Sequence, residues 1–152
     1  MRIAIIAVGK IKQPGLRAEL DDYLGRIRRY ASCDEIELKD AADRELIHRF
    51  ERALPERGLV VALEVDGRSH DSLGFSRFIG RCEMDSVATL AFLIGGAYGL
   101  PPAISTRAQQ RLSLSKLTLP HRLARVVLTE QIYRAFTILR NEPYAHESPS
   151  RR

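Results

Sequence analysis

The sequence predicts a single-domain α/β protein whose parallel sheet is covered by helices. Three observations support this prediction. Short apolar runs alternate along the chain with stretches in which apolar residues recur at helical spacing. The short runs are apolar on both faces, as is typical of strands buried inside a parallel sheet. The chain has 152 residues, which suits one domain and hardly two.

The N-terminal part predicts two strands, each followed by a helix. Residues 3–8 form an uninterrupted apolar strand. Apolar residues then recur at helical spacing over residues 16–27, and the alternating residues 36–38 predict a short strand. A second helical stripe over residues 46–54 ends at Pro55, because proline cannot continue a helix. Both helices therefore have an apolar face with which to cover the sheet.

The middle of the chain repeats this pattern. Residues 59–63 are predicted to be a buried strand, with a turn following at residues 66–67. We expect Ser72 to cap a helix whose buried face lies within residues 75–82. Residues 87–94 form the longest apolar strand. The strands and helices alternate, which favours parallel strands connected by crossover helices.

The C-terminal part supplies the last elements. Pro101 and Pro102 are predicted to open a short helix that reaches about residue 110, since proline suits the first helical turn. Residues 114–119 are predicted to be extended and to form the fifth strand, and the last helix covers residues 121–139. The sequence thus predicts five strands alternating with five helices.

The last helix is apolar over more than one face. Beside its main apolar stripe, Leu123, Val126 and Val127 extend the apolar surface onto a neighbouring face. One stripe is enough to dock a helix on a sheet. The wider surface favours an interface with a second subunit, and the alternative is a helix buried between two layers of one chain.

Composition limits the class of protein. There are 24 basic and 19 acidic residues, giving a formal net charge of +5, which favours an anionic partner, with nucleic acid the leading candidate. Arg17, Arg26, Arg28 and Arg29 could follow an RNA backbone, or they could simply form a solvated helix face. No apolar run approaches the length that crosses a bilayer, so we expect a cytoplasmic protein with no membrane partner.

Metal binding is not expected. The two cysteines, Cys33 and Cys82, lie far apart in the sequence and lack metal-ligand spacing, so we expect reduced, partly buried thiols. The four histidines are scattered and form no ligand motif.

Three segments at predicted strand ends have unusual composition. They are residues 64–67, the glycine-rich residues 95–99 and the neutral, leucine-rich residues 114–121. Open parallel sheets bind ligands beyond the carboxyl ends of their strands. Glycine lets the backbone approach a ligand, although a structural tight turn explains residues 95–99 equally well. The third segment, in which only Lys116 carries a full charge, could hold a flat neutral base, or it could be an ordinary buried strand.

Familiar catalytic motifs are missing from the sequence. It contains no GxGxxG or GK[ST] motif, which disfavours a nucleotide-binding metabolic enzyme, and no GxSxG nucleophile elbow. We therefore expect a reaction that needs little catalytic contribution from side chains. Methyl transfer from a sulfonium donor fits this requirement, because the donor is already activated and positioning supplies much of the rate.

Four segments are informative when they are taken together and in order: Phe92–Leu100, Leu112–His121, Glu130–Phe136 and Asn141–Tyr144. They resemble the ribosomal RNA large subunit methyltransferase H family, a small branch of the SPOUT superfamily. The resemblance spans essentially the whole chain. It implies a C-terminal trefoil knot, a homodimer, and methylation of N3 of a pseudouridine in 23S rRNA within the assembled 70S ribosome, with S-adenosylmethionine as the methyl donor. A SPOUT enzyme acting on another RNA such as a tRNA, or a non-catalytic ribosome-binding module, are the alternatives.

The resemblance also implies which residues contact the donor. These are Leu63, Gly95, Leu114, Ser115, Lys116, Leu117, Thr118 and Leu119. They fall on or beside the three strand-end segments described above.

The catalytic residues are not identified by the resemblance. Candidates are Tyr144 for donor or substrate contact, and His146, Glu130 or solvent as the general base. Arg134 is a candidate for contact with an RNA phosphate or the donor carboxylate, or for an intersubunit ion pair. Family members often end in Asn-His-Pro-Tyr-His-Arg. Here Glu142 replaces the first histidine, and the second is displaced by one position to His146.

Overall fold

The computed structural model describes residues 1–147, with side chains described as far as Ala145. Five strands form one parallel sheet in the order β2-β1-β4-β3-β5. The strands are β1 (Arg2–Val8), β2 (Ser32–Leu38), β3 (Leu59–Ser69), β4 (Thr89–Ile94) and β5 (Gln110–Ser113). The helices are α1 (Pro14–Ile27), α2 (Asp43–Ala53), α3 (Ser72–Met84), α4 (Pro102–Arg107), α5 (His121–Leu139) and the 3₁₀ helix η1 (Pro143–Glu147).

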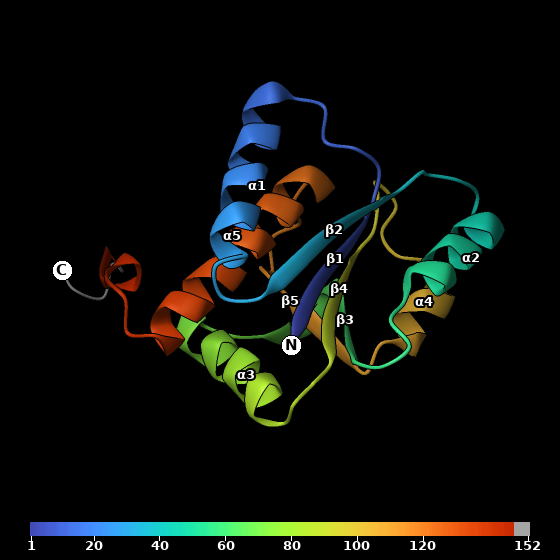
Figure 1. Ribbon diagram of the computed structural model, residues 1–152. Helices are drawn as coiled ribbons and strands as arrows, with labels where there is room; N and C mark the ends of the chain where they lie inside the picture. Colours follow the sequence, from blue (N-terminus) through green and yellow to red (C-terminus); the bar gives the residue numbers. More distant parts are fainter. Residues whose placement is uncertain (148–152) are drawn as a thin grey trace.

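The sheet lies between two unequal layers of helices. Helices α1, α3 and α5 cover one face, and α2 and α4 cover the other (Figure 1). Alternate residues of β1 point into these two layers, so that Ile3 and Ile5 join one apolar core while Ile6 and Val8 join the other. The predicted α/β class, with parallel strands alternating with five helices, is confirmed. The trefoil knot stays a prediction.

The turn predicted at residues 66–67 is wrong, because β3 continues to Ser69. The register against β5 shifts between Leu63 and Arg68, as at a β-bulge. A Cβ atom added to Gly67 would lie 2.8 Å from the backbone of Leu112. Glycine is needed here because a side chain would collide with β5. The sequence Asp66-Gly67 is also typical of a turn, which explains the wrong prediction.

The fifth strand was predicted too late in the sequence. It covers Gln110–Ser113, and residues 114–120 form a loop without regular structure. Helix α4 ends at Arg107 because Gln109 already pairs with β3: its N–H donates to the Val60 carbonyl at 3.0 Å, and its side-chain oxygen accepts from the Val60 N–H at 2.8 Å. The side chain that caps α3 is Asp71, which accepts from the Gly74 N–H at 2.6 Å, in place of the predicted Ser72.

Two further features concern the cysteine thiols and the possibility of a membrane-spanning helix. Cys33 and Cys82 are free and buried, and burial raises the pKa of the Cys33 thiol to about 12. Within the described residues, no helix combines the length and apolarity that a membrane span requires.

Helix α1 contains an exposed glycine that offers a test of its stability. A Cβ added at Gly25 would meet no atom within 4 Å, so alanine should fit without strain. We expect Gly25→Ala to raise the free energy of unfolding by about 0.5–1 kcal/mol, because glycine loses more backbone entropy than alanine in a helix. Urea unfolding followed by circular dichroism measures this change.

Gly80 on α3 is the matched control. Its added Cβ would lie 2.9 Å from Leu139 Cδ2, so Gly80→Ala should not show the same gain. An unchanged or lower unfolding free energy in the Gly25 variant would contradict the prediction.

Candidate functional site

A cavity of about 540 Å³ lies beside residues 63–65 of β3 and the end of β4. The loop of residues 114–120 and the first turn of α5 complete its wall. Every donor-contact residue predicted above lines this cavity except Lys116, whose exposed side chain is not part of the lining. Segments that are far apart in the sequence therefore meet at one edge of the sheet, as expected for a parallel α/β protein. Donor binding by these residues stays a prediction.

The glycine-rich loop is a tight turn and also a wall of the cavity. A Cβ atom added to Gly95 would lie 2.2 Å from the carbonyl carbon of Gly99. Gly99 has a positive φ of 80°, and its N–H donates to the Gly96 carbonyl at 3.0 Å. The two interpretations of this loop from sequence are thus compatible: the same glycines permit the turn and bring backbone close to the cavity.

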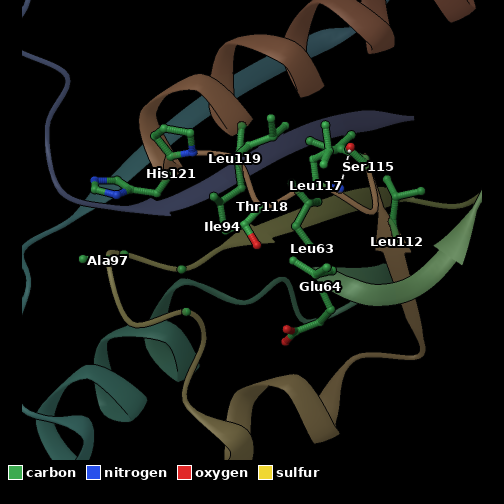
Figure 2. Close-up of a pocket in the computed structure, with 17 residues that line it drawn as sticks. Leu63, Glu64, Ile94, Ala97, Leu112, Ser115, Leu117, Thr118, Leu119 and His121 are labelled. Carbon is green, nitrogen blue, oxygen red and sulfur yellow. Dashed lines mark hydrogen bonds between the residues drawn. The ribbon is translucent and has the colours of Figure 1, made fainter.

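The loop of residues 114–120 forms the opposite wall. The Ser113 hydroxyl donates to the Ser115 carbonyl at 3.0 Å, and the Leu117 N–H donates to the Ser115 hydroxyl at 2.9 Å. Figure 2 shows Leu117 and Leu119 on the other side of the cavity from Glu64. The lining is mostly apolar or neutral, which suits a flat uncharged group better than a phosphate.

The cavity has two titratable side chains, Glu64 and His121. His121 lies at the same end as Ala97, away from Leu112 and Ser115 (Figure 2). Sequence reasoning did not select His121 or Ala124 as site residues, because the face that α5 turns to the sheet depends on packing. His121 is the last residue of the third strand-end segment and Ala124 lies three positions beyond it, and this proximity was the available signal. Within the described residues, no three His, Cys, Asp or Glu side chains gather as metal ligands would.

Arg125 fixes the start of α5 beside the cavity. Its side chain is 1% exposed and donates to Glu35 and Glu37 on β2 at 3.0 and 2.6 Å. It also donates to the carbonyls of Val8 and Gly9, at 3.2 and 2.8 Å. One buried cation therefore ties the helix that carries His121 to the ends of β1 and β2.

Three of the candidate catalytic residues form a cluster away from the cavity. Tyr144 donates its hydroxyl hydrogen to Glu130 at 2.9 Å, and Arg134 pairs with Glu130 at 2.8 Å. The Arg134 guanidinium also lies over the Tyr144 ring, 4.9 Å from its centroid. None of these three lines the cavity. The side chain of His146 lies outside the described part of the structure.

The residue that departs from the family pattern has a structural role. Glu142 accepts a hydrogen bond from the Tyr30 hydroxyl at 2.6 Å. The Tyr30 ring stacks on the Phe136 ring, with 5.3 Å between the ring centroids. Burial, followed by this hydrogen bond, raises the pKa of Tyr30 to about 12. Glu142 thus holds the C-terminal segment against Tyr30, which follows α1 and stacks on α5.

Most of the arginines considered for RNA contact, on and just after α1, are engaged within the chain. Arg17 pairs with Glu35 at 2.6 Å, and Arg26 pairs with Asp22 at 3.0 Å. Arg28 donates to the Cys33 carbonyl at 2.9 Å. These contacts favour a structural role over RNA binding for the three residues.

The parallel sheet and the mostly neutral cavity beside the carboxyl ends of its strands define a small α/β protein with a cavity of the size that small molecules occupy. A family model described as "Predicted SPOUT methyltransferase" matches residues 1–146. The chain therefore belongs to the SPOUT methyltransferase family.

Relatives support this assignment over nearly the full length. A protein from Sorangium cellulosum is 51% identical over 146 residues, covering 96% of this chain and 100% of the relative. One from Gemmatimonas aurantiaca is 41% identical over 153 residues, covering 95% and 99%. Both are named ribosomal RNA large subunit methyltransferase H. A solved probable methylase family protein from Haemophilus influenzae Rd KW20 has a TM-score of 0.59 at 12% identity, covering 93% of this chain and 69% of that one, and supports the fold alone.

Proposed function

We propose that this protein transfers a methyl group from S-adenosylmethionine to N3 of a pseudouridine in 23S rRNA of the assembled ribosome, as a cytoplasmic homodimer. The cavity carries this proposal, since its volume of about 540 Å³ lies in the usual range for small-molecule sites. Its mostly apolar and neutral walls suit adenine, and the loop at Gly95 lets backbone approach a ligand closely. The names of the relatives support large-subunit rRNA as the substrate.

The chain's own contribution is binding and orientation. The bound donor would supply an activated methyl group, and the cavity walls would hold the pseudouridine in line with it. The N3 proton must also leave, and a positioned base adds about 10²–10⁴-fold to such a step. Glu64 and His121 are the titratable side chains that line the cavity. Glu130, Arg134 and Tyr144 lie elsewhere in the same subunit, so a chemical role for them requires the second subunit.

The apolar surface of α5 supports the homodimer. Leu123 and Val127 lie one helical turn apart and are 41% and 38% exposed. Leu117 in the adjoining loop is 77% exposed. A second subunit that covered these residues would remove apolar surface from water close to the cavity.

Calorimetry tests donor binding directly. We expect S-adenosylmethionine and its demethylated product to bind the wild-type protein at one site per chain. Leu63→Asp places an unpaired charge in the apolar wall and should abolish the heat, whereas Gly25→Ala, far from the cavity, should bind normally. Absence of binding by the wild-type protein at high concentration would refute the proposed function.

Nucleoside analysis then identifies the substrate. Large-subunit rRNA from cells that lack the protein should lose N3-methylpseudouridine, and reintroducing the gene should restore it. Loss of a methylated nucleoside from tRNA would favour a SPOUT enzyme with another RNA substrate. Unchanged nucleosides with retained ribosome binding would favour a non-catalytic module.

A further inference from the structure

Tyr98 is an aromatic side chain that the fold presents to solvent. It is 101% exposed, although it is flanked by residues that line the cavity. The turn that carries it is closed by the bridge between Gly96 and Gly99. Behind this turn, Gly95 packs directly against Gly99 and Leu100. The ring therefore projects from a constrained turn at the edge of the cavity, where Ala97 is seen in Figure 2.

Three exposed basic residues lie beside the same region. Lys10 and Lys12 flank Ile11, which is buried and donates its N–H to Glu37 at 3.2 Å. Alternation around this buried residue leaves both lysines facing outward. Arg122 is exposed on the first turn of α5, one turn before Arg125. Within the described residues, none of these three cations forms an ion pair with a carboxylate.

Contacts between the segments that carry these residues bring the segments together beside the cavity. Arg125 binds the Gly9 carbonyl, which brings the segment of Lys10 against the start of α5. A Cβ added to Gly96 would lie 3.2 Å from Val8 Cγ1, so the turn of Tyr98 begins beside the end of β1. We define the four residues Tyr98, Lys10, Lys12 and Arg122 as the rim.

The two sides of Tyr98 differ in charge, and this difference determines on which side a polyanion such as RNA can bind. On its α2 side, Tyr98 shares a recess of about 140 Å³ with Asp40 and Asp43. These carboxylates repel phosphates. The cations of the rim lie on the β1 and α5 side, where phosphates are attracted.

We propose that the rim is the surface on which single-stranded RNA docks, with a base stacked on Tyr98 and backbone phosphates bound by Lys10, Lys12 and Arg122. This inference rests on the proposed function. A base that reaches a methyl donor in the cavity must leave its helical stack, and proteins hold unstacked RNA bases on exposed aromatic rings. A basic groove beside such a ring is the usual arrangement for single strands.

The test of stacking compares two substitutions at Tyr98 in the full-length protein. Tyr98→Ala should lower kcat/KM for 70S ribosomes lacking the modification by about 10- to 100-fold, the loss expected for one base stack. Tyr98→Phe keeps the ring and should stay within about twofold of wild type. Binding of S-adenosylmethionine by calorimetry should be unchanged in both variants, since Tyr98 is not part of the cavity lining.

The test of the phosphate contacts uses salt dependence. Lys10→Glu, Lys12→Glu and Arg122→Glu should each weaken association with ribosomes and reduce its dependence on salt concentration. Arg57→Glu is the matched control, because Arg57 is exposed just before β3 begins, at the opposite end of the strands. It should leave association and salt dependence near wild-type values.

Three results would overturn the inference. The first is normal kcat/KM in Tyr98→Ala together with unchanged salt dependence in the charge variants. The second is dissociation of the proposed homodimer by Tyr98→Ala in analytical ultracentrifugation, which would make Tyr98 a subunit contact. The third is a wild-type protein that binds the donor but neither ribosomes nor single-stranded RNA. Failure of donor binding itself would instead refute the proposed function.

Discussion

Replacing Arg125 with methionine should lower the free energy of unfolding by about 3–5 kcal/mol, the range measured when one partner of a buried ion pair is removed. Arg125 is 1% exposed, and one of its nitrogens bonds to both Glu35 and Glu37. Without it, Arg17 is the cation that stays paired with these two carboxylates, and the carbonyl of Gly9 loses its hydrogen bond from Arg125. Urea unfolding of the variant and the wild type measures the difference.

Two further variants separate the ion pairs from simple loss of packing. Arg17→Met removes a partly exposed partner of the same glutamates and should cost about 1 kcal/mol or less. Arg125→Met combined with Glu35→Gln and Glu37→Gln should recover part of the loss, because the two side chains then carry no charge and Arg17 still pairs with Asp21. A loss below about 1 kcal/mol in Arg125→Met would show that the buried cation contributes little.

Gly95→Ala should damage both stability and donor binding. The added Cβ would lie 2.2 Å from the Gly99 carbonyl carbon and 2.5 Å from the Leu100 nitrogen. Both are backbone atoms, so the turn must open to relieve the overlap. We expect a loss of about 1–3 kcal/mol in unfolding free energy. A comparable loss at the cavity would weaken binding of S-adenosylmethionine by about 10- to 100-fold.

Gly96→Ala is the appropriate comparison for this variant. Its added Cβ would meet Val8 Cγ1 at 3.2 Å, which is a side-chain atom that can move by a few tenths of an ångström. Donor affinity should therefore fall much less than in Gly95→Ala. Equal effects of the two substitutions in calorimetry and urea unfolding would show that the contact between Gly95 and Gly99 has no special importance.

The contacts of Arg125 and Glu142 could not be predicted from sequence patterns. Burial of Arg125 depends on glutamates 88 and 90 positions away, and no local pattern predicts such a pairing. The hydrogen bond from Tyr30 to Glu142 spans 112 positions. The sequence showed Glu142 only as a departure from the family pattern, whereas the structure shows that it accepts a hydrogen bond from Tyr30.

The sequence by itself determined the α/β class, the alternation of five strands with five helices, and the segments that meet at the cavity. This was possible because apolar periodicity is local, and because parallel strands bring their carboxyl ends to one edge. Only the tertiary structure decided that β3 continues through Gly67, that Arg125 is buried and that His121 and Ala124 join the cavity. It also separated Glu130, Arg134 and Tyr144 from the cavity within one subunit. Each of these outcomes depends on contacts between segments distant in the sequence, and short-range patterns carry no information about them.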